Sequence, residues 1–235
     1  MNLDSLSSPK EILSEIKKRG FFVYKDNFTV NLSDSVRREY SQKINCSNVL
    51  PTDSPIHEDA LSKLPVRQIE SRETSESSCN FMTTYFDEND DGNISINQMF
   101  NLLITMRHEL SKSWPTKSDN YWNACRIHHY PSGGGFFGMH KDTHTAAINL
   151  ENDFPYLQVS LLLSMKNRDF EVGGFRLIGR AGESFIEQES HYGAILIFDG
   201  LCDHGIDYID PQSEINYSSD RGRISALSNF YNKSL

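Results

Sequence analysis

Cysteine is scarce in this sequence, and so are long apolar runs. The four cysteines, Cys46, Cys79, Cys125 and Cys202, show no C-x-x-C spacing. No apolar stretch near the amino terminus has the pattern of a signal peptide or of a membrane span. We therefore expect a reduced, cytoplasmic location and no membrane partner.

Basic residues are also fewer than acidic residues. The chain has 23 Lys and Arg against 32 Asp and Glu, a net charge of -9, and a pI of about 5.3. No run of Lys or Arg forms a basic stripe. This composition disfavours a nucleic-acid partner and a polyanionic substrate.

No linker-like segment and no internal repeat divides the chain. A length of 235 residues is sufficient for one sizeable core and is ordinary for a single β-barrel or β-sandwich domain. We expect one domain over residues 1–235, with a helical amino-terminal part (1–122) and a jelly-roll core (123–235).

The first helix has clear start and stop signals. Ser8 is a candidate N-cap, Pro9 follows at the first helical position, Glu11 completes a capping box, and Gly20 marks the end. The pattern predicts a short strand directly afterwards, over 21–24, and further helices over about 35–44 and 96–113.

Two segments of the amino-terminal part have no regular hydrophobic period. Residues of about 46–78 are polar and contain three prolines, which predicts irregular structure or a lid-like insertion. The stretch Asp87–Gln98 fits a calcium-binding loop at several positions, but Gln98 cannot supply the bidentate carboxylate of the last position. We therefore interpret it as a turn before a helix and do not expect calcium.

Strand-like patterns dominate the carboxyl-terminal half. They cover 123–130, 157–165, 173–178, 193–198 and 223–231, separated by turn residues. The runs 157–165 and 194–198 are too short for membrane spans and are typical of buried strands. The sequence thus predicts a mainly β fold with flanking helices, a double-stranded β-helix or jelly roll.

A candidate metal site follows the glycine-rich turn after Tyr130. His140 and Asp142 are two residues apart, and residues i and i+2 of a strand point to the same face, so both can meet one ion if the strand frays after His140. His204 lies in a turn after a second apolar run. Two histidines and one carboxylate form the set that binds Fe(II) while leaving positions open for a co-substrate and oxygen.

At these residues the chain resembles the iron(II)/2-oxoglutarate-dependent oxygenases. The resemblance rests on His140-Lys-Asp142, on His204, and on Arg223-Ile-Ser225, which is similar to the family's R-x-S. Tyr130-Pro-Ser-Gly and the glycine pair in 171–177 add to it. The similarity spans about 123–232, roughly half of the chain.

The resemblance implies the roles of these residues. His140, Asp142 and His204 would hold Fe(II), with 2-oxoglutarate and O2 as co-substrates and ascorbate as a helpful additive in vitro. Arg223 and Ser225 would bind the far carboxylate of 2-oxoglutarate, whose other contact would be Tyr130. The planar fork of arginine suits a carboxylate.

Two choices around this site stay open. Arg221 is the rival of Arg223, although it lacks a hydroxyl residue two positions on. Arg126 and His128 share a strand face with Tyr130, so both become candidate substrate contacts if Tyr130 points into the barrel.

The expected reaction is hydroxylation of an unactivated C–H in a small polar molecule, a free amino acid or a derivative. Asp142 fills the place where halogenases of this family carry a small residue, which argues against halogenation. The alternatives are a desaturase or cyclase of the same family, or a jelly-roll metal sensor without turnover.

Overall fold

Helix α1 (Pro9–Arg19) begins and ends where the sequence predicts. The computed structural model describes residues 8–44, 48–50, 66–73, 78–87, 92–110, 121–143 and 156–232. At the start of α1, the Oγ of Ser8 accepts a hydrogen bond from the backbone N–H of Glu11. The Glu11 carboxylate accepts from the N–H of Ser8 at 2.8 Å in return. Gly20 ends the helix at φ +90°, a conformation that glycine adopts without strain.

The other two helices are α2 (Asn27–Ile44) and α3 (Ile94–Leu110). Helix α2 is longer than predicted because Asp26 caps it. The Asp26 carboxylate accepts from the N–H of Thr29 at 2.7 Å, and the Thr29 hydroxyl accepts from the N–H of Asp26 at 3.1 Å. The predicted end of α3, 111–113, lies outside the described residues.

One curled sheet contains all the strands of the described residues. Along its main path the order is β1-β10-β7-β12-β5-β4-β6-β11-β8-β9, and β3 pairs along most of β4 at the edge opposite to β5 and β6. Every pairing between strands is antiparallel except that of β2 with β3. The bounds are β1 (Phe21–Tyr24), β2 (Asn48–Leu50), β3 (Val66–Glu73), β4 (Ser78–Phe86), β5 (Tyr121–Pro131), β6 (Gly135–His140), β7 (Leu157–Leu162), β8 (Gly174–Ile178), β9 (Ser184–Ile186), β10 (Ile195–Asp199), β11 (Asp203–Ile209) and β12 (Gly222–Asn232).

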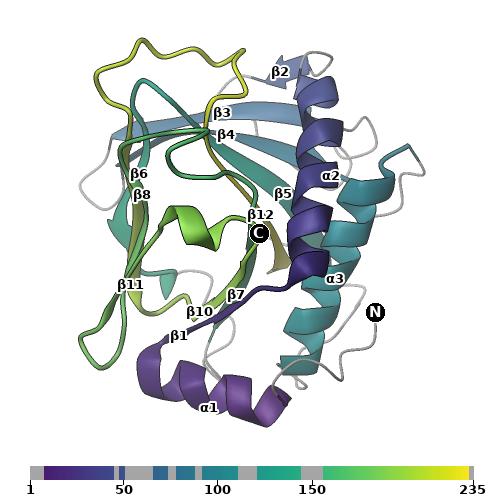
Figure 1. Ribbon diagram of the computed structural model, residues 1–235, viewed down its shortest axis with the longest axis vertical. Helices are drawn as coiled ribbons and strands as arrows, with labels where there is room; N and C mark the ends of the chain where they lie inside the picture. The colour runs from purple at the N-terminus through teal and green to yellow at the C-terminus, as the bar shows by residue number, and fades with distance from the viewer. Residues whose placement is uncertain are drawn as a thin grey trace.

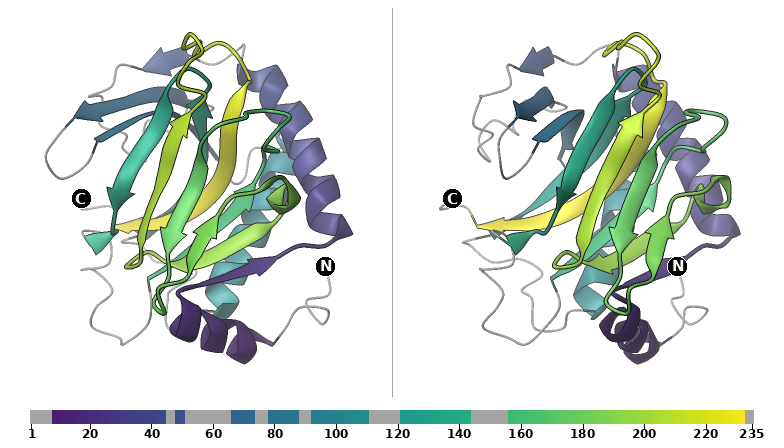
Figure 2. Two further views of the ribbon diagram at one scale, coloured as in Figure 1. Left: turned by 60° about the vertical axis from the view of Figure 1, so that its left-hand side comes forward. Right: turned by 90° about the vertical axis from the view of Figure 1, so that its left-hand side faces the viewer.

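The two faces of this sheet pack against different partners. Helices α2 and α3 lie side by side along one flank, with α1 at one end (Figure 1), and the strands curl away from them (Figure 2). On β10, Ile195 and Ile197 join the core beneath the helices, whereas Leu196 and Phe198 join an aromatic-rich core inside the curl. This alternation separates a structural face from a face that is free to carry chemistry.

The prediction of an irregular segment over 46–78 is wrong for part of its length. Residues 48–50 form β2 and 66–73 form β3, which pairs with β4 from Val66↔Tyr85 to Glu73↔Ser78. The hydrophobic alternation of β3 is hidden because Glu70 and Arg72 face the interior cavity of the curl. The remainder of the proposed lid, 46–47, 51–65 and 74–77, lies outside the described residues.

The mainly β prediction for the second half of the chain is confirmed. Each of the five predicted strands is present as β5, β7, β8, β10 or β12, with ends shifted by a few residues. The expected turn at His204 is wrong, because this residue is already in β11. The arrangement is a curled, mostly antiparallel sheet of the jelly-roll type with helices on one flank.

Two other expectations concern the amino-terminal part. Residues 88–91 of the calcium-like loop lie outside the described residues, so that interpretation stays a prediction. Among the described helices, none is both long and apolar enough to cross a membrane.

Candidate metal centre and adjoining cavity

His140 and Asp142 lie at the point where β6 ends. His140 is the last residue of the strand, and the backbone N–H of Asp142 donates to the carbonyl oxygen of Gly200 at 2.8 Å. That bond ties Asp142 to the turn between β10 and β11. A methyl group on Gly200 would meet the Asp142 carboxylate at 2.7 Å, so only glycine allows this approach.

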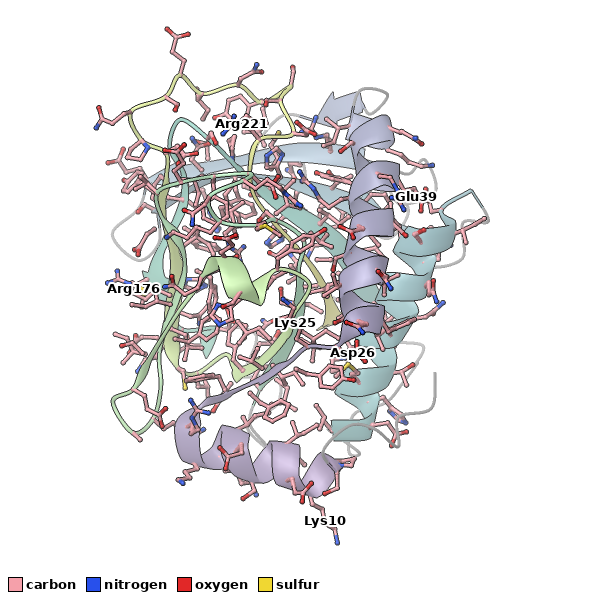
Figure 3. The ribbon with its side chains drawn as sticks, viewed as in Figure 1. Lys10, Lys25, Asp26, Glu39, Arg176 and Arg221 are labelled. Atoms are coloured by element: carbon pink, nitrogen blue, oxygen red, sulfur yellow. The ribbon has the colours of Figure 1, made fainter. Side chains whose placement is uncertain are left out.

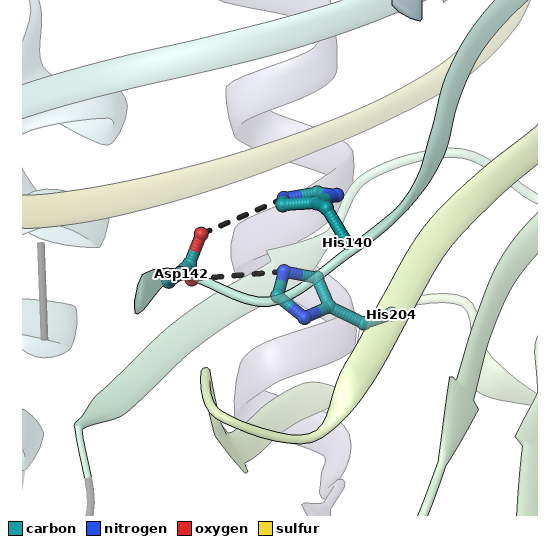
Figure 4. A group of neighbouring side chains, drawn as sticks. All are labelled: His140, Asp142 and His204. Atoms are coloured by element: carbon teal, nitrogen blue, oxygen red, sulfur yellow. Dashed lines mark ion pairs between the residues drawn. The ribbon is translucent and has the colours of Figure 1, made fainter. Parts of the chain in front are cut away.

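Strand β11 brings His204 to the same place. His204 is the register partner of His140 in the β6–β11 pairing. The Nε2 atoms of His140 and His204 lie 3.5 Å and 3.6 Å from the two carboxylate oxygens of Asp142 (Figure 4). The candidate ligand atoms all lie within 4.8 Å of one another, the arrangement expected around one ion.

Backbone carbonyls determine which nitrogen of each imidazole faces the Asp142 carboxylate. The Nδ1 of His140 lies 2.9 Å from the carbonyl oxygen of Gly138, and the Nδ1 of His204 lies 2.9 Å from that of Cys202. A carbonyl oxygen only accepts, so each Nδ1 carries a proton and each Nε2 keeps its lone pair. Metal-binding histidines are held in this way.

Aromatic side chains fix the planes of both rings. Phe137 stacks on His140 with ring centroids 4.2 Å apart, and Phe198 meets His204 edge-on at 4.9 Å. The rings therefore have little freedom to rotate away from Asp142.

The protein environment favours the metal-binding protonation state of His204 and Asp142. Burial lowers the pKa of His204, which favours the neutral ligand form. Burial acts to raise the pKa of Asp142, but the adjacent His140 and His204 and a hydrogen bond from Gln158 lower it overall, so Asp142 is a carboxylate. Burial acts to lower the pKa of His140, but the Asp142 carboxylate and the Gly138 carbonyl raise it overall.

Two neutral imidazoles and one carboxylate fit iron(II). The set comes from one end of the curl and leaves the cavity side uncovered, as a site with open coordination positions requires. Among the described residues, no other group of three histidine, cysteine or acidic side chains meets the geometry of a metal site.

A cavity of about 560 Å³ adjoins the three residues, and Arg223 also lines it. Arg223 is 2% exposed, and its Nη1 donates to the Ser225 hydroxyl at 2.9 Å. The Tyr130 ring lies beneath the guanidinium, with 5.5 Å between the ring centroid and Cζ. The structure thus brings the three residues of the expected 2-oxoglutarate site together on β5 and β12.

The two open choices have structural counterparts. Arg221 is exposed on the segment that precedes β12 (Figure 3) and does not line the cavity. Arg126 and His128 line the cavity beside Tyr130, as the strand alternation predicts. Burial, with Arg126 and Arg223 nearby, holds the pKa of His128 well below its usual value, so this imidazole is neutral.

Sequence reasoning missed two residues of the site. Gln158 donates to the Asp142 carboxylate at 2.8 Å, and Glu187 accepts from the Nε of Arg223 at 2.6 Å. The sequence pattern could have identified Gln158, because Gln158 and Ser160 are the polar residues in the otherwise apolar run of β7. Both line the cavity. No sequence pattern distinguishes Glu187, since it lies in a polar stretch after β9.

No family model matches the sequence, and no curated protein matches it. Solved structures do. A prolyl hydroxylase from Trichoplax adhaerens, in complex with a hypoxia inducible factor peptide fragment, matches with a TM-score of 0.59 and 10% identity over 96% of this chain and 90% of that one. EctD from S. alaskensis, with 2-oxoglutarate and 5-hydroxyectoine, gives 0.54 and 13% over 97% and 78%.

A third similar structure is named as a 2OG-Fe(II) oxygenase. It is an oxidoreductase of the 2OG-Fe(II) oxygenase family from Burkholderia pseudomallei, with a TM-score of 0.55 and 14% identity over 97% of this chain and 93% of that one. At such identities the likeness concerns the fold, which this chain shares along almost its whole length. The chain therefore has the jelly-roll fold of the iron(II)/2-oxoglutarate-dependent oxygenases.

Proposed function

We propose that the protein is an Fe(II)/2-oxoglutarate-dependent dioxygenase that hydroxylates an unactivated C–H of a small polar molecule, a free amino acid or a close derivative. The observation that carries the proposal is one cavity that contains both a His-Asp-His cluster and a buried arginine. A metal sensor without turnover has no need of the second feature.

The bound groups would supply the oxidising chemistry. Iron(II) would activate O2, and 2-oxoglutarate would provide two electrons as it is decarboxylated to succinate. One oxygen atom would enter succinate and the other the substrate. The protein contributes positions and protonation states. His140, Asp142 and His204 bind the metal, and Gln158 keeps the carboxylate of Asp142 turned toward it.

Arg223 would bind the far carboxylate of 2-oxoglutarate. Among the described residues, its Nη2 has no hydrogen-bond partner, and its Nη1 uses only one of two N–H groups, for Ser225. The guanidinium therefore has donors left for a bidentate carboxylate. Ser225 and Tyr130 complete a polar end in an otherwise aromatic wall.

The cavity wall supports a polar substrate. Arg126 and His128 on β5 and Glu70 and Arg72 on β3 offer charges of both signs and a neutral imidazole. A free amino acid carries one group of each sign. The cavity volume of about 560 Å³ is within the range of small-molecule sites.

The test is a screen of purified protein with Fe(II), ascorbate, 2-oxoglutarate and chloride against free amino acids, short peptides and protein extracts. Succinate release together with the gain of one oxygen atom on a free amino acid, by mass spectrometry, supports the proposal. A chlorinated or desaturated product, or oxidation confined to protein, contradicts the substrate and reaction assigned. Absence of succinate with every candidate contradicts the enzyme class.

A further inference from the structure

The arginine expected to bind 2-oxoglutarate already has a carboxylate partner within the protein. Glu187, the residue directly after β9, is 1% exposed and accepts from the Nε of Arg223 at 2.6 Å. The same oxygen accepts from the backbone N–H of Phe175 at 2.8 Å. Two donors thus hold this carboxylate in one place.

Glu187 lies behind Arg223 as seen from the cavity. Arg223, Ser225 and Tyr130 line the cavity, but Glu187 does not. It occupies the Nε edge of the guanidinium, whereas Nη2 and part of Nη1 remain for a ligand. A ligand carboxylate and the Glu187 carboxylate would therefore bind to different edges of one guanidinium.

The pair changes the charge that a ligand meets. Arg223 and Glu187 together are neutral, so an incoming carboxylate gains less Coulomb energy than it would from an unpaired buried arginine. We propose that Glu187 is a positioning and affinity-setting residue for Arg223. Glu187 holds the Nη end of the guanidinium toward the cavity, and its negative charge weakens the binding of the far carboxylate of 2-oxoglutarate. This inference rests on the proposed co-substrate.

The informative variant is Glu187→Gln. Glutamine keeps an oxygen that accepts from Arg223 and Phe175 but removes the negative charge, so the geometry is retained while the counter-charge is lost. Binding is measured by calorimetry on the Mn(II) form of the protein, in which a bound keto acid would not be turned over. The ligands are 2-oxoglutarate and 2-oxopentanoate, which has the same keto acid end but a methyl group in place of the far carboxylate.

We expect Glu187→Gln to lower the Kd of 2-oxoglutarate by on the order of tenfold and to leave that of 2-oxopentanoate unchanged. The matched control is Asp169→Asn. Asp169 also accepts from an arginine, Arg168, and from a backbone N–H, that of Met165, but it does not line the cavity. This control should change neither Kd.

The outcomes separate the two proposals. Wild-type protein that fails to bind 2-oxoglutarate in the Mn(II) form contradicts the proposed function, and with it this inference. Wild-type binding with equal or weaker binding by Glu187→Gln, or an equal shift for both keto acids, overturns the role of Glu187 alone.

Glu187→Gln leaves Arg223 buried without its counter-charge, so the variant could be too unstable for calorimetry. In that case thermal unfolding is followed with each keto acid. The far carboxylate of 2-oxoglutarate replaces the missing charge, so 2-oxoglutarate should raise the unfolding temperature of the variant more than that of the wild type, and 2-oxopentanoate should not. Equal stabilisation by both acids, or by neither, overturns the inference.

Discussion

His140 and His204 lie directly opposite each other in the antiparallel pairing of β6 with β11. Their ring centroids are 4.4 Å apart, and both Nε2 atoms face the Asp142 carboxylate. The distance between these ligands is therefore determined by strand register rather than by a flexible loop. Such a site should survive the loss of one ligand side chain without loss of the fold.

Replacement of His140 or His204 by alanine should abolish metal binding. Groups that only orient metal ligands contribute about 10- to 100-fold to affinity, so loss of a ligand should weaken Fe(II) or Mn(II) binding by more than that. Metal titration under anaerobic conditions measures the effect, and circular dichroism checks the fold. His191→Ala, on the short helix η4 (Glu189–His191) outside the cavity lining, is the control and should bind like the wild type. Wild-type metal affinity in either ligand variant would contradict the site.

Arg223→Ala should raise the Michaelis constant for 2-oxoglutarate by on the order of a hundredfold or more, because a buried carboxylate without its charged partner loses several kcal/mol. Arg221→Ala is the matched control, since Arg221 is exposed and outside the cavity lining. Steady-state kinetics with varied 2-oxoglutarate gives both values. The opposite ranking would transfer the role to Arg221.

Arg223→Ala also leaves Glu187 buried without its partner, which destabilises the protein. The double variant with Glu187→Gln removes that isolated charge. It should unfold at a higher temperature than Arg223→Ala alone and should still bind 2-oxoglutarate poorly, so stability and co-substrate binding are separated.

Gln158→Ala should weaken metal binding by about 10- to 100-fold. The Gln158 amide donates to the Asp142 carboxylate at 2.8 Å, and without it one oxygen of Asp142 is free to turn away from the two imidazoles. Metal titration measures the change, and Gln158→Asn tests whether a shorter amide restores it. An unchanged affinity in Gln158→Ala would show that the Gly200 contact alone holds Asp142.

The sequence was informative where local rules decide the structure. The capping residues of α1 and the alternation on β5 need only neighbours in the chain, and both predictions are confirmed: α1 is capped by Ser8 and Gly20, and Arg126, His128 and Tyr130 face one cavity.

Contacts between distant segments were not readable in this way. Glu187 and Arg223 are 36 residues apart in the chain and meet only through the tertiary fold. Strand β3 was missed because its cavity-facing side carries the charged residues Glu70 and Arg72, so the usual apolar alternation is absent from this strand.

Protein stability should fall as the pH drops below about 6.5, in part because of His129. This residue is 0% exposed on β5, and its Nε2 lies 2.9 Å from the carbonyl oxygen of Arg221. Burial lowers its pKa from 6.5 to about 4. Between these two values the unfolded chain binds a proton that the folded chain does not, so the free energy of unfolding rises with pH across this window.

A shift from 6.5 to about 4 corresponds to about 3 kcal/mol of stability that is present at neutral pH and lost by the lower end of the window. Chemical denaturation of the wild type at several pH values between 4 and 7 measures this slope. His129→Gln retains an amide that donates to the Arg221 carbonyl but does not titrate, so it should show a shallower slope. Parallel slopes would mean that His129 is protonated in the folded state or that its burial is relieved at low pH.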